Sequence, residues 1–485
     1  MKALRTYFSY DSFRVGQKEI IESVLSGYDT LAMLPTGSGK SLCYLLPGYM
    51  LDGTVLIVTP LLSLMQDQVE QLKAQGEKRV IAINSFLSYQ EKIRTIKNLH
   101  NYKFVYISPE MLQNEWVLDH IKKLKLSLFV VDEAHCISQW GYDFRPDYSQ
   151  LGNVRKFLNE PVTLALTATA TKEVREDIKT TLSLENVKEL IFSVNRPNIA
   201  IQVFSEISSF EKKELTIQFV KELKKPGIIY FSSKKAADEW ATKLQSVDGI
   251  KVASYHAGLS QEKRILIQQQ FLYNELDIIC ATSAFGMGIN KENVRFIIHY
   301  HPPLQMESYL QEIGRAGRDG LASVAILFNG DGDERLQFQL IEQELPTSVH
   351  IETFAELMKK KVQSFTNIEQ IELLGFTEIQ WRLLERLWNQ YSDQRSFTKM
   401  AEHYMNQRME TKIKKLYEFR SWIKNNTCRR EQLLSFFDEK LEERPKNCCD
   451  VCGIDWKLYN IHEERVNHRP KIEWRMYLKE LLNVK

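Results

Sequence analysis

The sequence lacks long hydrophobic runs, and it is not rich in glycine or proline. No apolar stretch approaches the roughly 20 residues that a membrane-spanning helix needs. Residues 1–7 begin no apolar stretch of signal-peptide length. With 44% hydrophobic and 26% charged residues, the 485-residue chain has the composition of a soluble globular protein. We therefore expect a cytoplasmic protein of roughly three domains, with no membrane partner.

The sequence as a whole also lacks an excess of positive or negative charge. The 64 basic and 62 acidic residues give a formal net charge of +2. This balance neither indicates nor excludes a nucleic-acid partner, because such a partner needs a localised basic stripe rather than a basic protein.

Cysteine is scarce, and its distribution argues against a disulfide framework. Three of the seven cysteines are isolated. The other four lie in one short stretch near the C-terminus and are Cys428, Cys448, Cys449 and Cys452. This pattern favours a reducing compartment and a single metal site.

Short β-branched runs alternate with helical stretches over the first two thirds of the chain. Each run is apolar nearly throughout, which is typical of strands buried on both faces of a parallel sheet. The first series comprises residues 30–34, 54–58, 104–107, 127–131 and 163–166; the second comprises 227–231, 251–255, 277–281, 295–299 and 323–328. Between the two series, residues 193–198 have the character of a linker. The pattern predicts two α/β domains in tandem, with ligands beyond the carboxyl ends of the strands.

The periodicity becomes helical after about residue 335. Apolar residues recur at helical spacing over 379–391, and residues 350–425 are expected to be all-helical. Thr377 and Gln380 have the form of a capping box, and Gly375 is placed to end the preceding helix. The helices around 368–374 and 377–391 suggest a helix-turn-helix-like module. The lysines at 359–361, 412, 414 and 415 either line a duplex or form a solvated face.

A glycine-rich loop follows the first predicted strand and opens an apolar helical stretch over residues 42–50. The loop consists of Thr36, Gly37, Ser38, Gly39, Lys40 and Ser41. Its glycines let the backbone N–H groups point at phosphate oxygens. Lys40 is placed to reach the β- and γ-phosphates, and Ser41 to hold Mg²⁺. Leu34 stands where the strict phosphate-loop pattern has its first glycine.

Two adjacent carboxylates end the strand predicted at 127–131. Magnesium-assisted nucleotide hydrolysis needs one carboxylate, here Asp132, to orient Mg²⁺ through its water shell. The next carboxylate, Glu133, is then placed to polarise the attacking water as general base. A solvated Asp-Glu pair is the alternative for an isolated pair, but together with Lys40 and Ser41 these residues favour nucleotide hydrolysis.

These motifs resemble those of superfamily-2 helicases, and specifically of the RecQ family, over nearly the whole of residues 1–330. Residues 13–17 resemble the adenine-recognition motif, which implies that Arg14 and Gln17 bind the nucleotide and that the amide of Gln17 reads the base edge. Residues 59–68 resemble motif Ia, which implies contacts with the DNA backbone. Residues 165–170 resemble motif III, which couples the ATP site to the DNA path.

Residues 136–146 follow the carboxylate pair directly and resemble the aromatic-rich loop that distinguishes RecQ enzymes. Trp140 and Phe144 offer faces on which unstacked bases stack, and Arg145 supplies phosphate charge or a cation–π contact. A buried aromatic cluster is the alternative, although Gly, Asp, Arg and Pro make this segment a poor core. Tyr142 stands where the family more often has His. The resemblance therefore does not extend to the role of that His in coupling DNA binding to hydrolysis.

The predicted second domain carries residues 284–291, which resemble motif V, and residues 311–320, which resemble motif VI. Charge on the transferred phosphoryl group needs a cation that the first domain does not supply. The resemblance implies that Arg318 is the arginine finger and Arg315 a second phosphate contact, with Gln311 in the same catalytic segment.

The four clustered cysteines resemble the RecQ zinc-binding region. Thiolates are the preferred donors of a closed, tetrahedral structural Zn²⁺. The family's spacing would place a cysteine at Lys446, whereas here the extra cysteine is the adjacent Cys448. Adjacent thiolates share one metal only if the backbone turns sharply, so Cys449 and Cys452 are firmer candidates than Cys448.

The predicted fold is α/β, with two tandem RecA-like parallel-sheet domains, a helical segment and a small zinc-binding module. The predicted limits are residues 1–195 and 196–335 for the two domains, 336–425 for the helical segment, 426–460 for the zinc module and 461–485 for a tail. No winged-helix domain is expected after the zinc module.

The resemblance implies an ATP-dependent 3′→5′ DNA helicase that uses ATP, Mg²⁺ and Zn²⁺ and serves recombination and repair. Expected partners are single-stranded and forked duplex DNA, a single-strand-binding protein and repair proteins, with a nucleoid location in a bacterium. Three alternatives are a DNA-stimulated translocase that does not separate strands, an RNA helicase and a non-catalytic nucleic-acid clamp.

Overall fold

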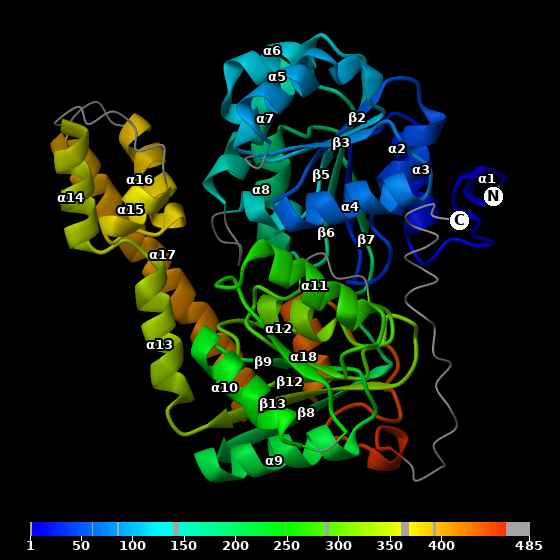
Figure 1. The fold of residues 1–485 in the computed structure, drawn as a ribbon, viewed down its shortest axis with the longest axis vertical. Helices are drawn as coiled ribbons and strands as arrows, with labels where there is room; N and C mark the ends of the chain where they lie inside the picture. Colours follow the sequence, from blue (N-terminus) through cyan, green and yellow to red (C-terminus); the bar gives the residue numbers. More distant parts are fainter. Residues whose placement is uncertain are drawn as a thin grey trace.

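The computed structural model describes residues 2–60, 62–84, 87–138, 145–247, 249–286, 291–359, 368–390 and 394–461. Two parallel sheets, each covered by helices, lie one above the other, and a helical projection stands beside them (Figure 1). This architecture confirms the predicted fold class of two RecA-like domains, a helical segment and a four-cysteine cluster.

The first sheet has seven parallel strands in the order β3-β4-β2-β5-β6-β1-β7. Its strands are β1 (Thr30–Met33), β2 (Thr54–Val58), β3 (Val80–Ile83), β4 (Phe104–Ile107), β5 (Leu126–Val131), β6 (Thr163–Thr167) and β7 (Lys188–Ile191). Its helices are α1 (Lys2–Phe8), α2 (Gln17–Leu25), α3 (Leu42–Met50), α4 (Leu62–Ala74), α5 (Tyr89–Lys97), α6 (Glu115–Lys122), α7 (Leu151–Phe157) and α8 (Lys172–Leu182), with short 3-10 turns η1 (Leu99–Asn101), η2 (Met111–Gln113), η3 (Ala134–Ile137) and η4 (Pro146–Gln150).

The second sheet has six parallel strands in the order β10-β11-β9-β12-β13-β8. Its strands are β8 (Ile199–Ile207), β9 (Gly227–Tyr230), β10 (Val252–Tyr255), β11 (Ile278–Ala281), β12 (Phe296–His299) and β13 (Ser323–Gly330). Its helices are α9 (Ser209–Glu222), α10 (Lys234–Gln245), α11 (Gln261–Leu272) and α12 (Met306–Ile313).

All ten predicted strands are confirmed, but β3, β7 and β8 are absent from the prediction. All three lie at sheet edges. β7 and the second half of β8 are partly exposed, so they lack the continuous apolar run that identifies a strand buried on both faces. β3 is apolar and mostly buried, and its composition gives no reason for the omission.

Buried side chains form one core that continues from the first sheet, through the second, to the cysteine cluster. Its members include Val131, Ile201, Ile313, Trp422 and Cys448. Separate clusters fill the outer face of each sheet. The surfaces of the two domains that face each other are therefore bound together by apolar burial, and the cysteine region shares that core.

The helical segment departs from the second sheet and returns to it. It comprises α13 (Asp333–Glu344), α14 (Ser348–Lys359), α15 (Ile368–Leu373), α16 (Glu378–Gln390) and α17 (Gln394–Lys424). We call α13 and the C-terminal half of α17 the arm, and α14, α15, α16 and the N-terminal half of α17 the head (Figure 1). The head has a hydrophobic core of its own, which includes Phe354, Trp381, Leu384 and Phe397.

The local signals predicted for the head are confirmed. Gly375 has φ +84° and follows the end of α15. Thr377 Oγ1 accepts the N–H of Gln380 at 3.2 Å, and Gln380 Oε1 accepts the N–H of Thr377 at 3.0 Å, which completes the capping box.

Lysines of the arm form ion pairs within the protein. Lys412 Nζ lies 2.8 Å from Glu344 of α13, and Lys415 Nζ lies 2.6 Å from Glu307 of α12. These pairs hold the arm together and fix it to the second domain, so they favour a structural role for both lysines over a duplex-lining one. Residues 360 and 361 lie outside the described ranges. No helix in the described ranges is both long and apolar enough to cross a membrane.

The last described elements, α18 (Arg429–Phe436) and η5 (Trp456–Leu458), belong to the cysteine region. This region joins the second sheet at its edge, because the N–H of Ile201 in β8 is bonded to the carbonyl of Cys448, and the N–H of Asp450 to the carbonyl of Ile201. The protein thus extends the exposed edge of β8 with backbone from the cysteine region.

Candidate active site

A cavity of about 590 Å³ lies between the two sheets and brings the predicted nucleotide-site residues together. Its lining contains all of them except Ser38: Arg14, Gln17, Thr36, Gly37, Gly39, Lys40, Ser41, Asp132, Glu133, Gln311, Arg315 and Arg318. The first nine come from the first domain and the last three from α12 and the segment after it. A cavity of this size is typical of a small-molecule or cofactor site.

The glycine-rich loop joins β1 to α3 and has the predicted backbone geometry. Gly37 and Gly39 adopt φ angles of +84° and +77°, which side chains other than glycine rarely tolerate. Lys40 Nζ lies 2.9 Å from Glu133 Oε1, so the loop lysine and the proposed general base form an ion pair. An incoming triphosphate would compete with this carboxylate for Lys40.

Burial and charge together shift the pKa values of these groups. Burial favours neutral Lys40, but Glu133 and Asp132 outweigh it and raise the pKa of Lys40 above its ordinary value. Burial likewise opposes ionisation of Glu133, but Lys40 and His135 hold its pKa below the ordinary value. For Asp132, burial dominates and raises the pKa to about 6. Glu133 is therefore ionised at neutral pH, while Asp132 is the more easily protonated carboxylate.

The backbone of Glu133 is strained. Glu133 has φ +48° and ψ 48°, in the left-handed region, at the turn from β5 into η3. Such a conformation costs a non-glycine residue about 1–3 kcal/mol and persists only where surrounding contacts fix it. Here Asp132 Oδ1 accepts the N–H of Glu133 at 2.9 Å, and the Tyr148 hydroxyl donates to the carbonyl of Asp132 at 3.0 Å. This turn aims both carboxylates into the cavity.

His135 connects the carboxylate pair to the segment that resembles motif III. Its Nδ1 lies 2.9 Å from Thr167 Oγ1 and 3.5 Å from Glu133 Oε2. Thr167 Oγ1 in turn lies 3.2 Å from the carbonyl of Thr169. A displacement of residues 167–169 would therefore reach Glu133 through one imidazole ring.

Arg14 and Gln17 both contact the glycine-rich loop. Gln17 Nε2 donates to the carbonyls of Ser38 and Gly39 at 2.8 and 3.1 Å. Arg14 Nη1 donates to the carbonyl of Gly37 at 2.7 Å, and its Nη2 lies 3.1 Å from Glu292 of the second domain. The predicted adenine recognition by these two residues stays a prediction, but their position beside the phosphate loop is established.

Arg315 and Arg318 reach the cavity from the second domain. A Cβ built on Gly37 would lie 2.6 Å from Arg318 Cγ, so the side chain of Arg318 packs directly on the glycine-rich loop. Burial, together with Arg315 and Arg196, lowers the pKa of Arg318 to about 9. Several cations thus converge where phosphate charge is expected to lie.

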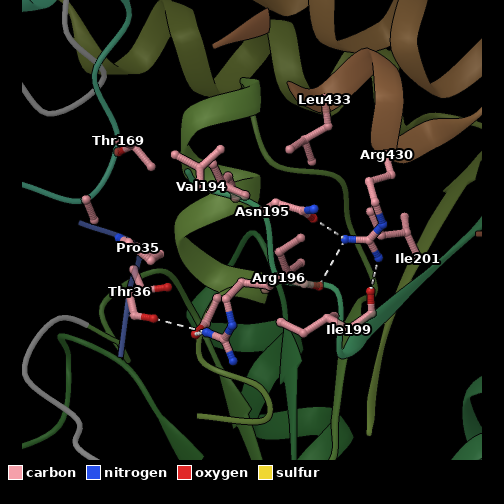
Figure 2. A pocket seen from close by; sticks show the side chains of 14 residues that line it. Pro35, Thr36, Thr169, Val194, Asn195, Arg196, Ile199, Ile201, Arg430 and Leu433 are labelled. Atoms are coloured by element: carbon pink, nitrogen blue, oxygen red, sulfur yellow. Dashed lines mark hydrogen bonds between the residues drawn. The ribbon is translucent and has the colours of Figure 1, made fainter. Parts of the chain in front are cut away.

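Arg196, in the linker between the sheets, joins the glycine-rich loop of the first domain to the segment after α12 of the second, beside a smaller pocket that Figure 2 shows. Its Nη1 donates to the carbonyls of Thr36 and Gly314 at 3.0 and 3.1 Å. Its Nη2 donates to the carbonyls of Ala316 and Gly317 at 2.9 and 2.6 Å. Its Nε lies 3.4 Å from Asn198 Oδ1, so all five N–H donors of the guanidinium have acceptors.

The linker is held in turn by Arg430 of α18 (Figure 2). Arg430 Nη1 donates to Asn195 Oδ1 at 2.8 Å and to the carbonyl of Arg196 at 2.9 Å, and Nη2 donates to the carbonyl of Ile199. Neither arginine was among the predicted site residues. The available signal was an arginine inside a short Pro-containing linker, but sequence alone does not show that its side chain reaches both domains.

The predicted DNA contacts are described only in part. Trp140 and Phe144 lie outside the described residues. Arg145 Nη1 donates to the carbonyl of Pro60 at 2.7 Å, which joins the end of the aromatic-rich loop to the segment that resembles motif Ia.

The four clustered cysteines converge. Their Sγ atoms all lie within 4.8 Å of one another, and the Sγ atoms of Cys428 and Cys448 are 3.6 Å apart. The chain turns sharply after the cysteine pair, since the N–H groups of Cys452 and Gly453 both donate to the carbonyl of Cys449. The four thiols therefore fit one tetrahedral metal site. The position of Cys448 suits this site as well as the positions of the other three cysteines do.

Comparison with known proteins agrees with this geometry. Residues 14–177 match the DEAD/DEAH box helicase family, residues 211–320 the helicase conserved C-terminal domain, and residues 391–453 the RecQ zinc-binding domain. A probable ATP-dependent DNA helicase RecS of Bacillus subtilis is 46% identical over 100% of this chain and 98% of its own length. The chain belongs to the RecQ family of ATP-dependent DNA helicases. The match to the RecQ zinc-binding domain includes all four clustered cysteines.

More distant relatives differ in their coverage. The ATP-dependent DNA helicase RecQ of Haemophilus influenzae is 35% identical over 95% of this chain, which spans 64% of that protein. A putative ATP-dependent RNA helicase of Acanthamoeba polyphaga mimivirus is 33% identical over 97% of this chain and 75% of its own length. Among solved structures, the helicase MrfA bound to DNA matches 69% of this chain and 52% of its own length with a TM-score of 0.58 at 19% identity, which reflects the fold alone.

Proposed function

We propose that this RecQ-family helicase moves 3′→5′ along single-stranded DNA and separates duplex DNA during recombination and repair. The direction and the cellular process rest on the family. The observation that carries the motor itself is the convergence of Lys40, Glu133 and Arg318 from two domains on one cavity. Single-stranded and forked DNA are the proposed substrates. A single-strand-binding protein and repair proteins are proposed partners.

In the proposed reaction, Glu133 orients and polarises the attacking water, and Lys40 leaves its ion pair with Glu133 to bind the β- and γ-phosphates. Arg318 acts as the arginine finger and Arg315 as a second phosphate contact. Both belong to the segment that Arg196 holds against the glycine-rich loop. Charge that develops on the transferred group is thus met by cations already in place.

Magnesium fits the donors present. Ser41 offers a hydroxyl and Asp132 a carboxylate to the same cavity, and oxygen donors of this kind suit a hard cation. Bound there, Mg²⁺ would supply charge neutralisation on the phosphates.

Movement follows from a site divided between two domains. When nucleotide occupies the cavity, Arg315 and Arg318 bind the same phosphates as Lys40, which favours the closed arrangement. Hydrolysis removes that shared ligand. The chain from Glu133 through His135 to Thr167 offers a route by which the change reaches the segment after β6.

ATP hydrolysis tests the proposal. It is measured without nucleic acid, with single-stranded DNA and with RNA of the same sequence, for the wild type and for Glu133→Gln. Stimulation by DNA above that by RNA, lost in Glu133→Gln, supports the proposed DNA motor. Equal stimulation by RNA would favour an RNA substrate, which the name of the mimivirus relative motivates. Unwinding of a 3′-tailed but not a 5′-tailed duplex then tests direction.

A further inference from the structure

The head and arm form an arch that starts on the second domain and ends on the first. At its base, Lys415 of α17 lies 2.6 Å from Glu307 of α12, and Gln337 of α13 donates to the carbonyl of Pro303 at 2.7 Å. The ring of Trp422 packs on Tyr309 at 5.1 Å between centroids. The arm is therefore fixed to the second domain by buried and polar contacts together.

At its far end, the arch meets the first domain through α16. Arg382 Nη1 lies 3.6 Å from Asp147 Oδ2 and 3.8 Å from Glu110 Oε1. Asp147 belongs to η4, whose first residue, Pro146, is also the last residue of the aromatic-rich loop, and Glu110 follows β4. These carboxylates lie beyond strand ends of the first sheet. The head therefore contacts the first domain just after Arg145, whose Nη1 donates to the carbonyl of Pro60 in the segment that resembles motif Ia.

A hollow lies beneath the base of the arch. It has a volume of about 380 Å³ and is bounded on one side by residues beyond the strand ends of the second sheet, among them Ser232, Thr282, Ser283 and His301. On the other side it is bounded by Glu344 and Lys412 of the arm. Hydroxyl groups at strand ends are suitable donors to phosphate oxygens.

These contacts close a ring. The two domains are joined through the linker, and the arm departs from the second domain (Figure 1). Arg382 of the head pairs with Asp147 and Glu110 of the first domain. A single strand of DNA that crosses the carboxyl ends of both sheets, from the hollow to Arg145 and Pro60, would run under this arch. The same strand ends are where ligands bind in open parallel sheets.

We propose that the arch encloses the tracking single strand of DNA and that the contact of Arg382 with Asp147 and Glu110 is the gate through which an unbroken strand enters. Enclosure prevents the strand from leaving sideways while the cleft opens and closes. The gate is suited to opening, because ion pairs between partly exposed side chains are weak and are screened by salt. This inference rests on the proposed function, since it requires that the protein bind single-stranded DNA.

Covalent closure of the gate tests the inference. Arg382→Cys and Asp147→Cys are combined in the zinc-loaded, full-length chain, and a short bismaleimide links the two thiols. The wild type treated with the same reagent controls for its own cysteines, of which only Cys452 is not buried. Binding is then compared on a linear single strand and on a covalently closed circle of the same sequence.

If the arch encloses DNA, protein linked before mixing binds the linear strand within about threefold of the unlinked protein but loses at least tenfold in affinity for the circle. Protein linked after loading stays on the circle through a wash with 1 M salt and leaves when a nuclease cuts it. Equal binding of linear and circular DNA by the linked protein overturns the inference. Failure of the unlinked protein to bind either form overturns the proposed function, and this inference with it.

A second measurement covers the case in which the double variant does not fold. Arg382→Glu places a carboxylate beside two others and is expected to open the gate, which shortens the lifetime on circular DNA at least threefold. Adding Asp147→Arg and Glu110→Arg to Arg382→Glu restores opposite charges and is expected to restore the lifetime. Unchanged lifetimes in all three proteins would also overturn the inference.

Discussion

Two arginines tie separate parts of the molecule to the first domain, and their surroundings differ. Arg196 has an acceptor for each of its five N–H groups, at 2.6 to 3.4 Å, and four of the five are backbone carbonyls. Arg382 faces two carboxylates at 3.6 and 3.8 Å, and 38% of its side chain is exposed. The contacts of Arg196 hold the two domains in a fixed arrangement. The contact of Arg382 is one that water and salt can compete with.

The comparison shows how one residue type serves rigidity in one place and movement in another. Removing a fully satisfied guanidinium leaves several partly buried carbonyls without a donor, which costs roughly 1–3 kcal/mol for each group that water does not reach. Removing one partner of an exposed ion pair leaves groups that water hydrates at little cost. The hydrolytic site is therefore expected to depend on Arg196, and DNA enclosure on Arg382.

Loss of zinc should have the largest effect, because the cysteine region anchors the joint through Arg430. Cys449→Ser is expected to abolish zinc binding and to lower Tm by at least about 5 °C, since bound structural metal contributes directly to folding free energy. Metal content and calorimetry measure this. Cys448→Ser is expected to do the same if all four thiolates bind the metal. Cys43→Ala, at an isolated buried thiol, is the control and should retain zinc. Zinc at wild-type content in Cys449→Ser would contradict the assignment.

Substitution of Arg196 should come next. Arg196→Gln is expected to lower kcat for DNA-stimulated ATP hydrolysis at least about tenfold, or 1.4 kcal/mol, because it releases the segment that carries Arg315 and Arg318. The KM for ATP should change less than about threefold, since Arg196 contacts only carbonyls. Arg196→Lys should recover part of kcat, because a lysine supplies three donors instead of five. Arg79→Gln, at an exposed ion pair, is the control. An equal loss of kcat in Arg79→Gln would show that Arg196 does not position the catalytic segment. A fall in the Tm of Arg196→Gln large enough to explain its loss of kcat would show the same.

Salt should separate the two contacts with a smaller effect. Raising NaCl from 0.05 to 0.5 M is expected to shorten the lifetime of the wild type on circular single-stranded DNA, because salt screens exposed ion pairs. The lifetime of Arg382→Glu, whose gate is already open, should shorten less. The rate of ATP hydrolysis per bound DNA should fall little over the same range, since the five hydrogen bonds of Arg196 go to neutral carbonyl oxygens. The same salt dependence in both proteins would show that Arg382 does not close the gate.

The smallest effect concerns pH. The pKa of Asp132 is raised to about 6 by burial, so its ionised form is lost as pH falls through that value. If Asp132 binds Mg²⁺, kcat/KM for MgATP should fall with a slope of one below about pH 6, because protons and metal compete for the same carboxylate. A profile flat down to pH 5 would place the metal elsewhere.

The sequence predicted the parts of this molecule that local pattern determines. Strands buried on both faces are continuous apolar runs, and the glycine-rich loop and the pair Asp132 and Glu133 have fixed spacings beside them. Edge strands β7 and β8 were not predicted, because half-exposed strands lack such continuous apolar runs. Arg196 and Arg382 escaped for another reason. Apart from Asn198, their partners lie 118 or more residues away in the sequence, so only the folded chain shows what they bind.

In the proposed function, the second domain completes the hydrolytic site of the first. Arg318→Lys tests it most directly, through single-turnover ATP hydrolysis on saturating single-stranded DNA beside the affinity for a fluorescent ATP analogue. We expect Arg318→Lys to hydrolyse ATP at least about 100-fold more slowly, with nucleotide affinity within about threefold of wild type, because an arginine finger acts mainly in the transition state. Hydrolysis within threefold of wild type would contradict the claim and assign the catalytic cation to another residue.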